Sequence, residues 1–317
     1  MECSLETVGK LLREAHRVVI TGHIHPDGDC LGSMLACYDL LTGLGKEVEV
    51  LLDDEIPAVY SFLPGVDKVR RPSEVIEADF LVVVDASDRE RITGVSETVR
   101  AKVINLDHHI SNTKFADYWY VDSAAAATGE IILRLIRLMG GKVTLSSAVN
   151  LYTAIVTDSG FFRYANTTAT TLRFAADLVE CGVTPNLISE YLDTKPLSSI
   201  TTMLEVLKTL DIQSNGKVAS ITVEPEMLQE GGESTEGLIN YPRNISGVEI
   251  AIMFKKVASN TTRVSLRSRN ADVSRLALAF GGGGHMRAAG CTVEGEFDQA
   301  KKKILEAAGK ILTELSV

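Results

Sequence analysis

The first half of the chain alternates short apolar runs with segments of helical periodicity, and this alternation constrains the fold more than any other feature. The apolar runs are residues 17–20, 47–52, 80–84 and 102–106, and a helical pattern passes through 31–36. The third run, Phe-Leu-Val-Val-Val, is continuously apolar and rich in β-branched residues, which is typical of a strand buried on both faces by helices. Strands that alternate with helices are joined by right-handed crossovers, so the sequence predicts an α/β fold with a doubly wound parallel sheet.

The length and the later pattern predict two domains. The chain has 317 residues, of which 45% are apolar, and globular domains usually contain about 100–200 residues. Residues 126–210 are mainly helical in pattern, and strands return after a turn signal, Ser-Asn-Gly, at 214–216. We therefore expect a first domain over 1–186, a helical linker over 187–212 and a smaller mixed α/β domain over 213–317.

The smaller domain carries a basic stretch that the overall charge conceals. The whole chain has 32 Lys and Arg against 42 Asp and Glu, for a net charge of −10, which taken alone argues against a nucleic-acid partner. Residues 241–291, however, contain eight basic residues and two acidic ones, for a net charge of +6. This excess of positive charge indicates either a surface that binds a negatively charged partner or simply a solvated face. The motifs described below decide between these two interpretations.

Other features of the sequence predict a cytoplasmic protein that does not span a membrane. No apolar run approaches the roughly 18 residues that a membrane helix needs. The first residues, Met-Glu-Cys-Ser-Leu-Glu, lack the basic and apolar regions of a secretory signal. Five cysteines are scattered without paired spacing, as expected in a reducing compartment. They are Cys3, Cys30, Cys37, Cys181 and Cys291.

Histidines and aspartates follow the predicted strands at the points where each strand ends. Ligands bind at the carboxyl ends of the strands in a doubly wound sheet, so we expect these side chains to converge on one rim. The first run leads into His23, His25, Asp27 and Asp29, the third into Asp85, the fourth into Asp107, His108 and His109, and the apolar stretch 151–157 into Asp158.

So many carboxylates at one rim require cations. Gathered carboxylates repel one another and cost several kcal/mol unless they are protonated or compensated, and these segments contain no lysine or arginine. A mixed His and Asp set suits Mn²⁺ or a similar ion better than an all-oxygen site for Mg²⁺ or Ca²⁺. There are more carboxylates than one ion needs, which favours two ions bridged by Asp85. Two ions about 3.5–4 Å apart can activate water and clamp a phosphoryl group.

These motifs, in order and spacing, resemble those of the DHH phosphoesterase superfamily. Residues 281–290, Gly-Gly-Gly-Gly-His-Met-Arg-Ala-Ala-Gly, resemble the glycine-rich motif of the associated DHHA1 domain. The short two-domain layout is similar to that of the bifunctional oligoribonuclease (nanoRNase) and pAp phosphatase group. The resemblance implies a DHH domain, a helical connector and a DHHA1 domain, with the active site in the interdomain cleft.

The resemblance also implies roles for the residues at the rim. His23, Asp27 and Asp85 would hold one Mn²⁺, and the other ion would be held by Asp29, Asp85, His108 and Asp158. Asp107 would support and orient the site, and His109 would face the scissile phosphate. His25 departs from the family, which commonly has Asn there, so it stays outside this set.

In the second domain, the glycine segment and a row of arginines are candidates for phosphate binding. The segment that precedes Gly281 has a helical pattern, which argues against a Rossmann fingerprint and favours a cradle of main-chain N–H groups at Gly283 and Gly284, next to His285. Arg263, Arg267 and Arg269 share one face of a predicted strand. We favour Arg267 and His285 as substrate contacts. The alternative for the glycine segment is a flexible turn, and the alternative for Arg263 and Arg269 is an edge strand protected by charge.

The activity expected from this resemblance is Mn²⁺-dependent hydrolysis of short RNA oligonucleotides, dinucleotides and pAp. The alternative within the same chemistry is a phosphodiesterase for cyclic di-AMP or pApA. A non-hydrolytic nucleotide sensor and an inorganic pyrophosphatase are less favoured, because the ligand set is complete and the glycine motif is present. The sequence leaves open the metal used (Mg²⁺ or another divalent ion) and the oligomeric state, for which a homodimer is one option.

Overall fold

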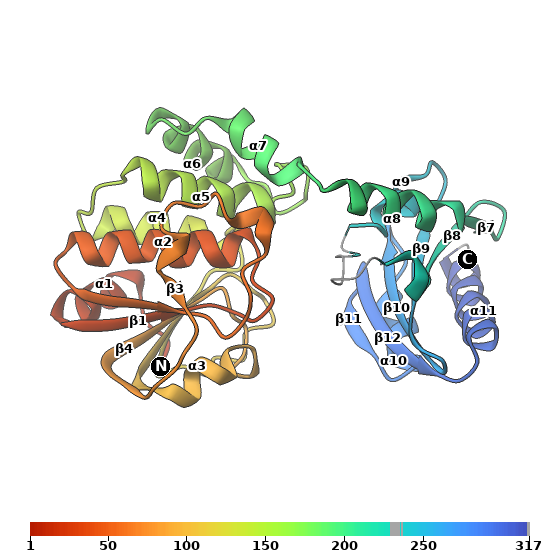
Figure 1. Ribbon diagram of the computed structural model, residues 1–317, viewed down its shortest axis with the longest axis horizontal. Coiled ribbons are helices and arrows are strands. Elements are labelled where there is room, and N and C mark those ends of the chain that lie inside the picture. Colours follow the sequence, from red (N-terminus) through yellow and green to blue (C-terminus); the bar gives the residue numbers. More distant parts are fainter. Residues whose placement is uncertain (229–234, 236, 316–317) are drawn as a thin grey trace. The chain divides into compact units, whose positions relative to one another are not determined.

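The chain folds into two compact units, each built on its own sheet (Figure 1). A computed structural model describes residues 1–228, 235 and 237–315. The first unit is Met1–Thr194 and the second Lys195–Val317. The division between them falls inside the stretch 187–212 that the sequence suggests as a linker, and the precise domain bounds stay a prediction.

The first unit contains a six-stranded sheet in which every pair of neighbours is parallel. The strand order β3-β2-β1-β4-β5-β6 reverses direction between β1 and β4, as in doubly wound folds, so the predicted sheet is confirmed. Strands β3 and β6 were not predicted, because they are too short to form a distinct run. The strands are β1 (Arg17–Thr21), β2 (Glu47–Leu51), β3 (Val69–Arg70), β4 (Ile76–Val84), β5 (Val99–Asp107) and β6 (Tyr118–Val121).

Helices cover both faces of this sheet. Helices α2, α4 and α5 lie on one side of it and α3 on the other (Figure 1). Along β4, Val82 and Val84 pack into the first layer and Leu81 and Val83 into the second, so this strand is buried on both faces as its apolar run predicts. The helices are α1 (Leu5–Glu14), α2 (Gly28–Gly43), α3 (Thr93–Thr98), α4 (Thr128–Leu138), α5 (Leu145–Asp158), α6 (Ala169–Glu180) and α7 (Pro185–Asp193).

Two glycines of α2 allow it to pack closely against α5. A Cβ atom on Gly32 would collide with the carbonyl oxygen of Asn150, and one on Gly28 would collide with the side chain of Thr157. The close approach brings the start of α2 next to the end of α5. Residues at these two helix ends are among the predicted metal ligands.

The second unit is a mixed α/β structure. Its sheet has the order β11-β12-β10-β9-β8-β7, in which β8 and β9 are parallel and the other neighbours antiparallel. Its elements are α8 (Leu197–Lys208), β7 (Asp211–Gln213), β8 (Val218–Val223), α9 (Asn240–Asn244), β9 (Ile250–Ala258), β10 (Thr261–Ser268), α10 (Val273–Ala279), β11 (Gly283–His285), β12 (Ala288–Glu294) and α11 (Phe297–Leu315). The second unit also contains a short 3-10 helix, η4 (Pro225–Met227), and the first unit contains η1 (Ala58–Tyr60), η2 (Val66–Lys68) and η3 (Glu90–Ile92).

The two faces of the second sheet are covered differently. One face packs against α10 and α11, and it includes Val264 and Leu266 of β10. On the other face, α8 packs over β8 and β9 through Val206. The part of this face that belongs to β10 presents Arg263, which is exposed, and Arg267, which is half-buried, so the predicted alternation is confirmed for these two arginines.

No helix within the described part of the chain is long and apolar enough to cross a membrane.

The close packing of α2 against α5 can be tested with a glycine pair. Gly32→Ala should lower the free energy of unfolding by about 1–3 kcal/mol, because the added methyl group meets backbone that is held in a helix. Gly43→Ala, in the last position of the same helix, has nothing within 4 Å of the added atom and should be neutral or gain up to about 1 kcal/mol. Urea denaturation of both variants measures the difference, and equal stability would contradict the packing.

Candidate metal centre

The six predicted ligands lie at the ends of strands and helices of the first unit. Asp85 follows β4 directly, and His108 follows the last residue of β5. Asp27 is the N-cap residue of α2, where its Oδ1 accepts a hydrogen bond of 3.0 Å from the Cys30 N–H. The other three ligands are His23 in the loop after β1, Asp29 in the first turn of α2 and Asp158 at the end of α5.

Three of these residues form a first group of donor atoms. His23 Nε2 lies 3.7 Å from Asp27 Oδ1 and 3.4 Å from Asp85 Oδ2. The other ring nitrogen, Nδ1, lies 2.8 Å from the Ile24 carbonyl oxygen. A metal-binding histidine usually donates its second N–H in this way, which fixes the ring and directs Nε2 at the ion.

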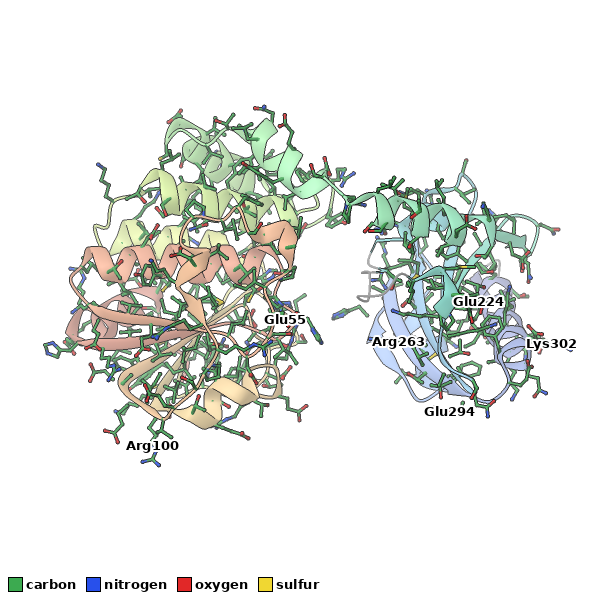
Figure 2. The ribbon with its side chains drawn as sticks, viewed as in Figure 1. Glu55, Arg100, Glu224, Arg263, Glu294 and Lys302 are labelled. Carbon is green, nitrogen blue, oxygen red and sulfur yellow. The ribbon has the colours of Figure 1, made fainter. Side chains whose placement is uncertain are left out.

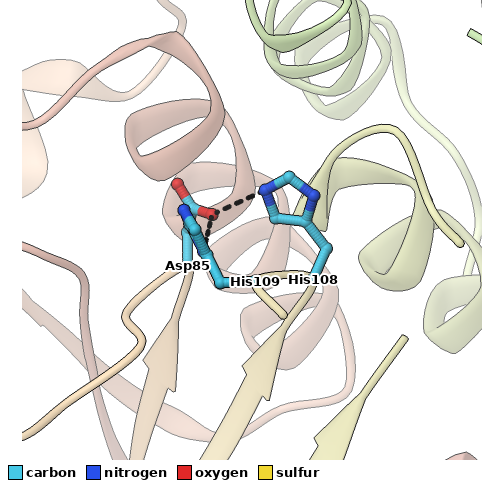
Figure 3. Close-up of side chains that lie close together, drawn as sticks. All are labelled: Asp85, His108 and His109. Carbon is cyan, nitrogen blue, oxygen red and sulfur yellow. Dashed lines mark ion pairs between the residues drawn. The ribbon is translucent and has the colours of Figure 1, made fainter. Parts of the chain in front are cut away.

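The second group surrounds His108. Its Nε2 lies 3.8 Å from Asp29 Oδ2, 3.6 Å from Asp85 Oδ1 and 3.4 Å from Asp158 Oδ2. Figure 3 shows the His108 ring facing the Asp85 carboxylate. Asp85 therefore directs one oxygen at each group, which is the arrangement of a bridging carboxylate.

The donor atoms fit divalent cations. Bonds of about 2.0–2.2 Å place the ligands of one ion about 3–3.5 Å apart, and the separations above need only small movements to reach this. Three donors within 4.8 Å of one another occur both in the group of His23, Asp27 and Asp85 and in the group of Asp29, His108 and Asp158. These residues can hold a metal ion, as the sequence predicts.

Asp85 is fixed in a backbone conformation that few residues adopt. Its φ is 57°, in the left-handed region, where Asp is tolerated better than most residues. The Asp85 N–H donates to the Leu106 carbonyl oxygen of β5 over 3.0 Å, and Thr128 Oγ1 donates to Asp85 Oδ1 over 3.0 Å. Asp85 is thus held at its backbone by β5 and at its carboxylate by Thr128 of α4.

Asp29 is held by the start of α4. Its carboxylate accepts hydrogen bonds from the backbone N–H groups of Thr128 (2.6 Å) and Gly129 (2.9 Å), and from Ser33 Oγ (3.0 Å). The first N–H groups of a helix lack partners within the helix, and Asp29 supplies one from a distant part of the chain. The Asp29 carboxyl group therefore lies at the positive end of the α4 dipole.

Burial and mutual repulsion shift the pKa values of the carboxyl groups. Burial, together with the charges of Asp85, Asp158 and Asp27, raises the pKa of Asp29 well above its ordinary value. Burial, together with Asp85 and Asp27, raises the pKa of Asp158 to about 6. Both shifts have the direction expected where negative charges crowd together, and divalent cations would balance these charges.

The pKa values of His23 and His109 are also raised, although burial acts on them in the opposite direction. Burial disfavours the imidazolium of His23, but hydrogen bonds to Asp27 and Asp85 outweigh it and raise its pKa to about 10. Burial is likewise outweighed at His109, where Asp107 and Asp85 raise the pKa.

Asp107 lies beneath the surface of the site and holds His109 and the backbone of His108 in place. The carboxylate is fully buried and accepts hydrogen bonds from His109 Nδ1 (2.7 Å), the His108 N–H (2.8 Å) and Asn112 Nδ2 (2.6 Å). These contacts orient His109, which Figure 3 shows beside Asp85 and His108. Asn112 Nδ2 also donates to Asn105 Oδ1 over 2.8 Å. The hydrogen bonds that hold Asp107 therefore continue to Asn105, inside strand β5.

His25 lies apart from both donor groups. Its side chain is 88% exposed, and its Nδ1 lies 3.0 Å from Asp54 Oδ2. The backbone of His25 has a φ of 56°, and its N–H also donates to Asp54. The loop therefore turns His25 toward Asp54 and leaves His23 and Asp27 facing the centre.

The glycine segment of the second unit is used mainly to end a helix and pack a hairpin. The N–H groups of Gly281 and Gly282 donate to carbonyl oxygens at the end of α10, so two of the four glycine N–H groups are occupied. Gly283 pairs with Gly290 in the sheet. Gly284 has a φ of 138°, and a Cβ there would press on Ala289. These contacts are enough to explain why glycine occupies these positions. Phosphate binding by Gly283 and Gly284 stays a prediction.

The predicted basic contacts occupy different places in the second unit. Arg263 and Gly283 help to line a hollow of about 430 Å³, and Arg263 is labelled in Figure 2. Arg267 Nη1 donates to the Leu266 carbonyl oxygen over 3.0 Å, and His285 is exposed on β11. The remaining predicted contact, Arg269, lies beyond the end of β10 and donates to the Ile245 carbonyl oxygen, so it is not part of the strand's row.

Several residues of the site carry no signal in the sequence. Thr128, Asn112 and Arg91 contact Asp85, Asp107 and His23 respectively. Each lies in a segment without a distinct motif, so sequence reasoning missed all three. Only Ser33, four residues after Asp29 on the same helix, follows a spacing that could have revealed its contact.

Comparisons with known proteins agree with this geometry. Residues 17–157 match the model of the DHH family, N-terminal domain, and residues 220–314 match the DHHA1 domain. The chain is 36% identical to the bifunctional oligoribonuclease and PAP phosphatase NrnA of Thermus thermophilus, over 93% of this chain and 90% of that protein. It is 26% identical to the protein of the same name from Bacillus subtilis, over 87% and 89%.

Solved structures share the fold. An exopolyphosphatase-related protein from Bacteroides fragilis superposes with a TM-score of 0.88 at 25% identity, covering 98% of this chain and 96% of that one. RecJ from Thermus thermophilus, solved in complex with Mn²⁺, superposes with a TM-score of 0.53 at 14% identity, covering 98% of this chain and 55% of that one.

The chain belongs to the DHH family and joins its N-terminal domain to a DHHA1 domain. It is a hydrolase that acts on phosphate esters, as the sequence predicts.

The raised pKa of Asp158 predicts how stability depends on pH when metal is removed. Because this pKa rises from 3.8 to about 6 on folding, the folded state binds the proton more tightly, and stability falls as the pH rises through this range. Asp158→Asn should therefore stabilise the metal-free protein by about 1–3 kcal/mol at pH 8. The gain should shrink toward zero as the pH falls to about 4.

Urea denaturation in EDTA across this pH range measures the effect. Asp193→Asn, at an exposed position of α7, is the control and should leave the pH profile unchanged. Loss of stability in Asp158→Asn at pH 8 would contradict the proposed electrostatic strain.

Proposed function

We propose that this protein hydrolyses short RNA oligonucleotides, dinucleotides and pAp at a centre of two divalent cations, with Mn²⁺ as the favoured ion. The observation that carries the proposal is the shared carboxylate: Asp85 directs Oδ2 at His23 and Oδ1 at His108. A single ion would need only one of these groups. Mn²⁺ is favoured because each group combines an imidazole with carboxylates, and Mg²⁺ is the alternative.

The ligands divide as the family resemblance implies. His23, Asp27 and Asp85 would hold one ion, and Asp29, Asp85, His108 and Asp158 the other. Two such ions lower the pKa of water and neutralise charge that develops on a phosphoryl group.

The protein's own groups would orient the reaction. His109 donates from Nδ1 to Asp107, so Nε2 is the nitrogen that can donate a proton to the leaving oxygen. The raised pKa of His109 keeps that proton available near neutral pH. Asp107 acts through His109 and the His108 backbone, and it binds neither ion.

The second unit would bind the phosphates of the substrate. Arg267 and His285 are the favoured contacts, and the hollow lined by Arg263, Ser265 and Gly283 offers a second place for a phosphate group. Arginine suits this task because its planar guanidinium matches phosphate oxygens. Arg269 and Gly284 stay weaker candidates, since their contacts are explained by the fold of the unit itself.

The relatives support nucleotide substrates, because the two named above are oligoribonucleases and PAP phosphatases. We also propose a cytoplasmic location, for which the free state of all five cysteines is consistent support. A homodimer is one option for the assembly.

A substrate panel with Mn²⁺ separates this proposal from its alternatives. We expect hydrolysis of a five-nucleotide RNA, of dinucleotides with different bases, and of pAp. Preference for cyclic di-AMP, or for pApA over the other dinucleotides, would indicate the signalling phosphodiesterase instead. Hydrolysis of pyrophosphate alone would indicate a pyrophosphatase, and binding without turnover a nucleotide sensor.

Replacing the shared carboxylate tests the two-ion centre. Asp85→Asn should lower kcat about 10²–10⁴-fold, because the bridge supports several kcal/mol of transition-state stabilisation. It should also lower the number of Mn²⁺ ions bound per chain, measured by calorimetry. Asp193→Asn is the charge-matched control, and undiminished turnover in Asp85→Asn would refute the model.

Replacing the basic contacts tests the role of the second unit. Arg267→Met and His285→Ala should each raise KM for a dinucleotide about 10–100-fold with little change in kcat, because a hydrogen bond to a charged group contributes about 1.5–3 kcal/mol. Arg275→Met, which removes a cation paired with Glu314 on the surface, is the control. Unchanged KM in both test variants would show that the assignment is wrong.

A further inference from the structure

Asn166 links two separate parts of the first unit beside the candidate metal centre. It lies in the connection between α5 and α6, eight residues after Asp158 and outside the motif segments. Its Nδ2 donates to the carbonyl oxygen of Asp158 over 3.1 Å and to that of Ala126 over 3.0 Å. Because a backbone carbonyl group can only accept, the two hydrogens of the amide group fix its orientation. One side chain therefore joins the end of α5 to the segment that leads into α4.

Residues 125–129, which we call the α4 entry, hold three of the four ligands in the second group of donor atoms, around His108. All five residues of the α4 entry are buried. The contacts run from the Ala125 carbonyl oxygen to His108 Nδ1 (3.3 Å), from the Thr128 and Gly129 N–H groups to Asp29 (2.6 and 2.9 Å), and from Thr128 Oγ1 to Asp85 Oδ1 (3.0 Å). One short segment thus positions these three ligands relative to one another.

Asp158 is the fourth ligand of this group, and it comes from a different helix. Its Oδ2 lies 3.4 Å from His108 Nε2. Within the described part of the chain, the α4 entry donates no hydrogen bond to the Asp158 carboxylate. The position of this carboxylate relative to the other three ligands therefore depends on how the end of α5 is held against the α4 entry. Asn166 bonds to both.

The connection that carries Asn166 turns back sharply after α5. Residues 160–162 lie one after another in the left-handed region, with φ of 56°, 55° and 63°, and two of them are phenylalanines. The Tyr164 N–H also donates to the Ser159 carbonyl oxygen over 3.1 Å. A bulky residue is strained in the left-handed region, and strained backbone of this kind collects at functional sites. This turn brings Asn166 back to the last residue of α5.

We propose that Asn166 is a positioning residue for the second metal ion. By tying the end of α5 to the α4 entry, it places Asp158 where it can share one ion with the other three ligands. Asn166 itself contacts neither an ion nor the substrate. The proposal rests on the proposed two-ion function. It concerns only the second ion, because neither of these hydrogen bonds involves His23 or Asp27.

A simpler role for this side chain is to complete the end of a helix. The last carbonyl groups of a helix lack partners within the helix, and Asp158 is the last residue of α5. A cap of this kind would stabilise the unit as a whole, and its loss would not distinguish one metal ion from the other. Positioning predicts a loss that is confined to the second ion.

The test compares Mn²⁺ binding by the wild type, by Asn166→Ala and by the control Asn186→Ala, at an exposed position of α7. Calorimetry should show two binding steps in the wild type, and the step that Asp158→Asn loses identifies the second ion. Asn166→Ala should weaken that step about 10–100-fold, the usual effect of removing a group that orients a metal ligand. It should leave the other step unchanged, and Asn186→Ala should change neither.

Recovery by excess metal is a second readout. Hydrolysis of a dinucleotide by Asn166→Ala should rise toward the wild-type rate as the Mn²⁺ concentration is raised, because excess ion compensates for a lower affinity. Asn166→Ser keeps one donor, so it should weaken the second ion less, and it gives the same comparison if the alanine variant fails to fold. Unchanged affinity for the second ion, or an equal loss for both ions, overturns the proposal.

Failure of the proposed function gives a different pattern. If the wild type binds only one Mn²⁺ per chain, the two-ion centre is wrong, and the role of Asn166 falls with it. If the wild type binds two ions and Asn166→Ala keeps both affinities, only the role of Asn166 is wrong. If the wild type binds two ions but hydrolyses none of the nucleotides, the substrate assignment is wrong, and the binding comparison still decides the role of Asn166.

Discussion

Repulsion between buried carboxylates is the constraint on which the first unit depends. Asp29 and Asp85 are almost completely buried. Together with Asp158, they surround Nε2 of His108 at distances of 3.4–3.8 Å. Such a group of charges is tolerated only where the surrounding structure offers many fixed donors or where cations bind. The fold provides fixed donors, since the start of α4 donates to Asp29, and it also turns ring nitrogens of His23 and His108 toward the carboxylates.

The doubly wound topology explains why these residues meet. Strands β1 and β4 are neighbours at the point where the strand order reverses, and the loops after them diverge there to opposite sides of the sheet. His23 and Asp85 follow these two strands, so they face each other across that opening. Two helices contribute the remaining aspartates. Gly28 and Gly32 let α2 approach α5 closely, and this brings Asp29 near Asp158.

The sequence predicts which candidate ligands lie close together, because most of them follow an element that is itself easy to recognise. Asp85 ends a continuous apolar run, and His108 follows another. Predictions fail where a contact depends on tertiary approach alone. Thr128 and Asn112 reach the site from loops and helix starts that have no pattern, and β3 has only two residues. The glycine segment shows a further limit, because Gly281 and Gly282 end α10, a local task that resembles anion binding in composition.

The surroundings of His23 show why such missed residues matter. A motif identifies the side chains that can bind an ion, and it does not say what holds each of them in place. His23 Nδ1 lies 2.8 Å from the Ile24 carbonyl oxygen and 3.1 Å from Arg91 Nη2, while Nε2 faces Asp27 and Asp85. The orientation of this ring therefore depends on the backbone of its own loop and on a residue far along the chain, and a local sequence pattern reveals neither contact.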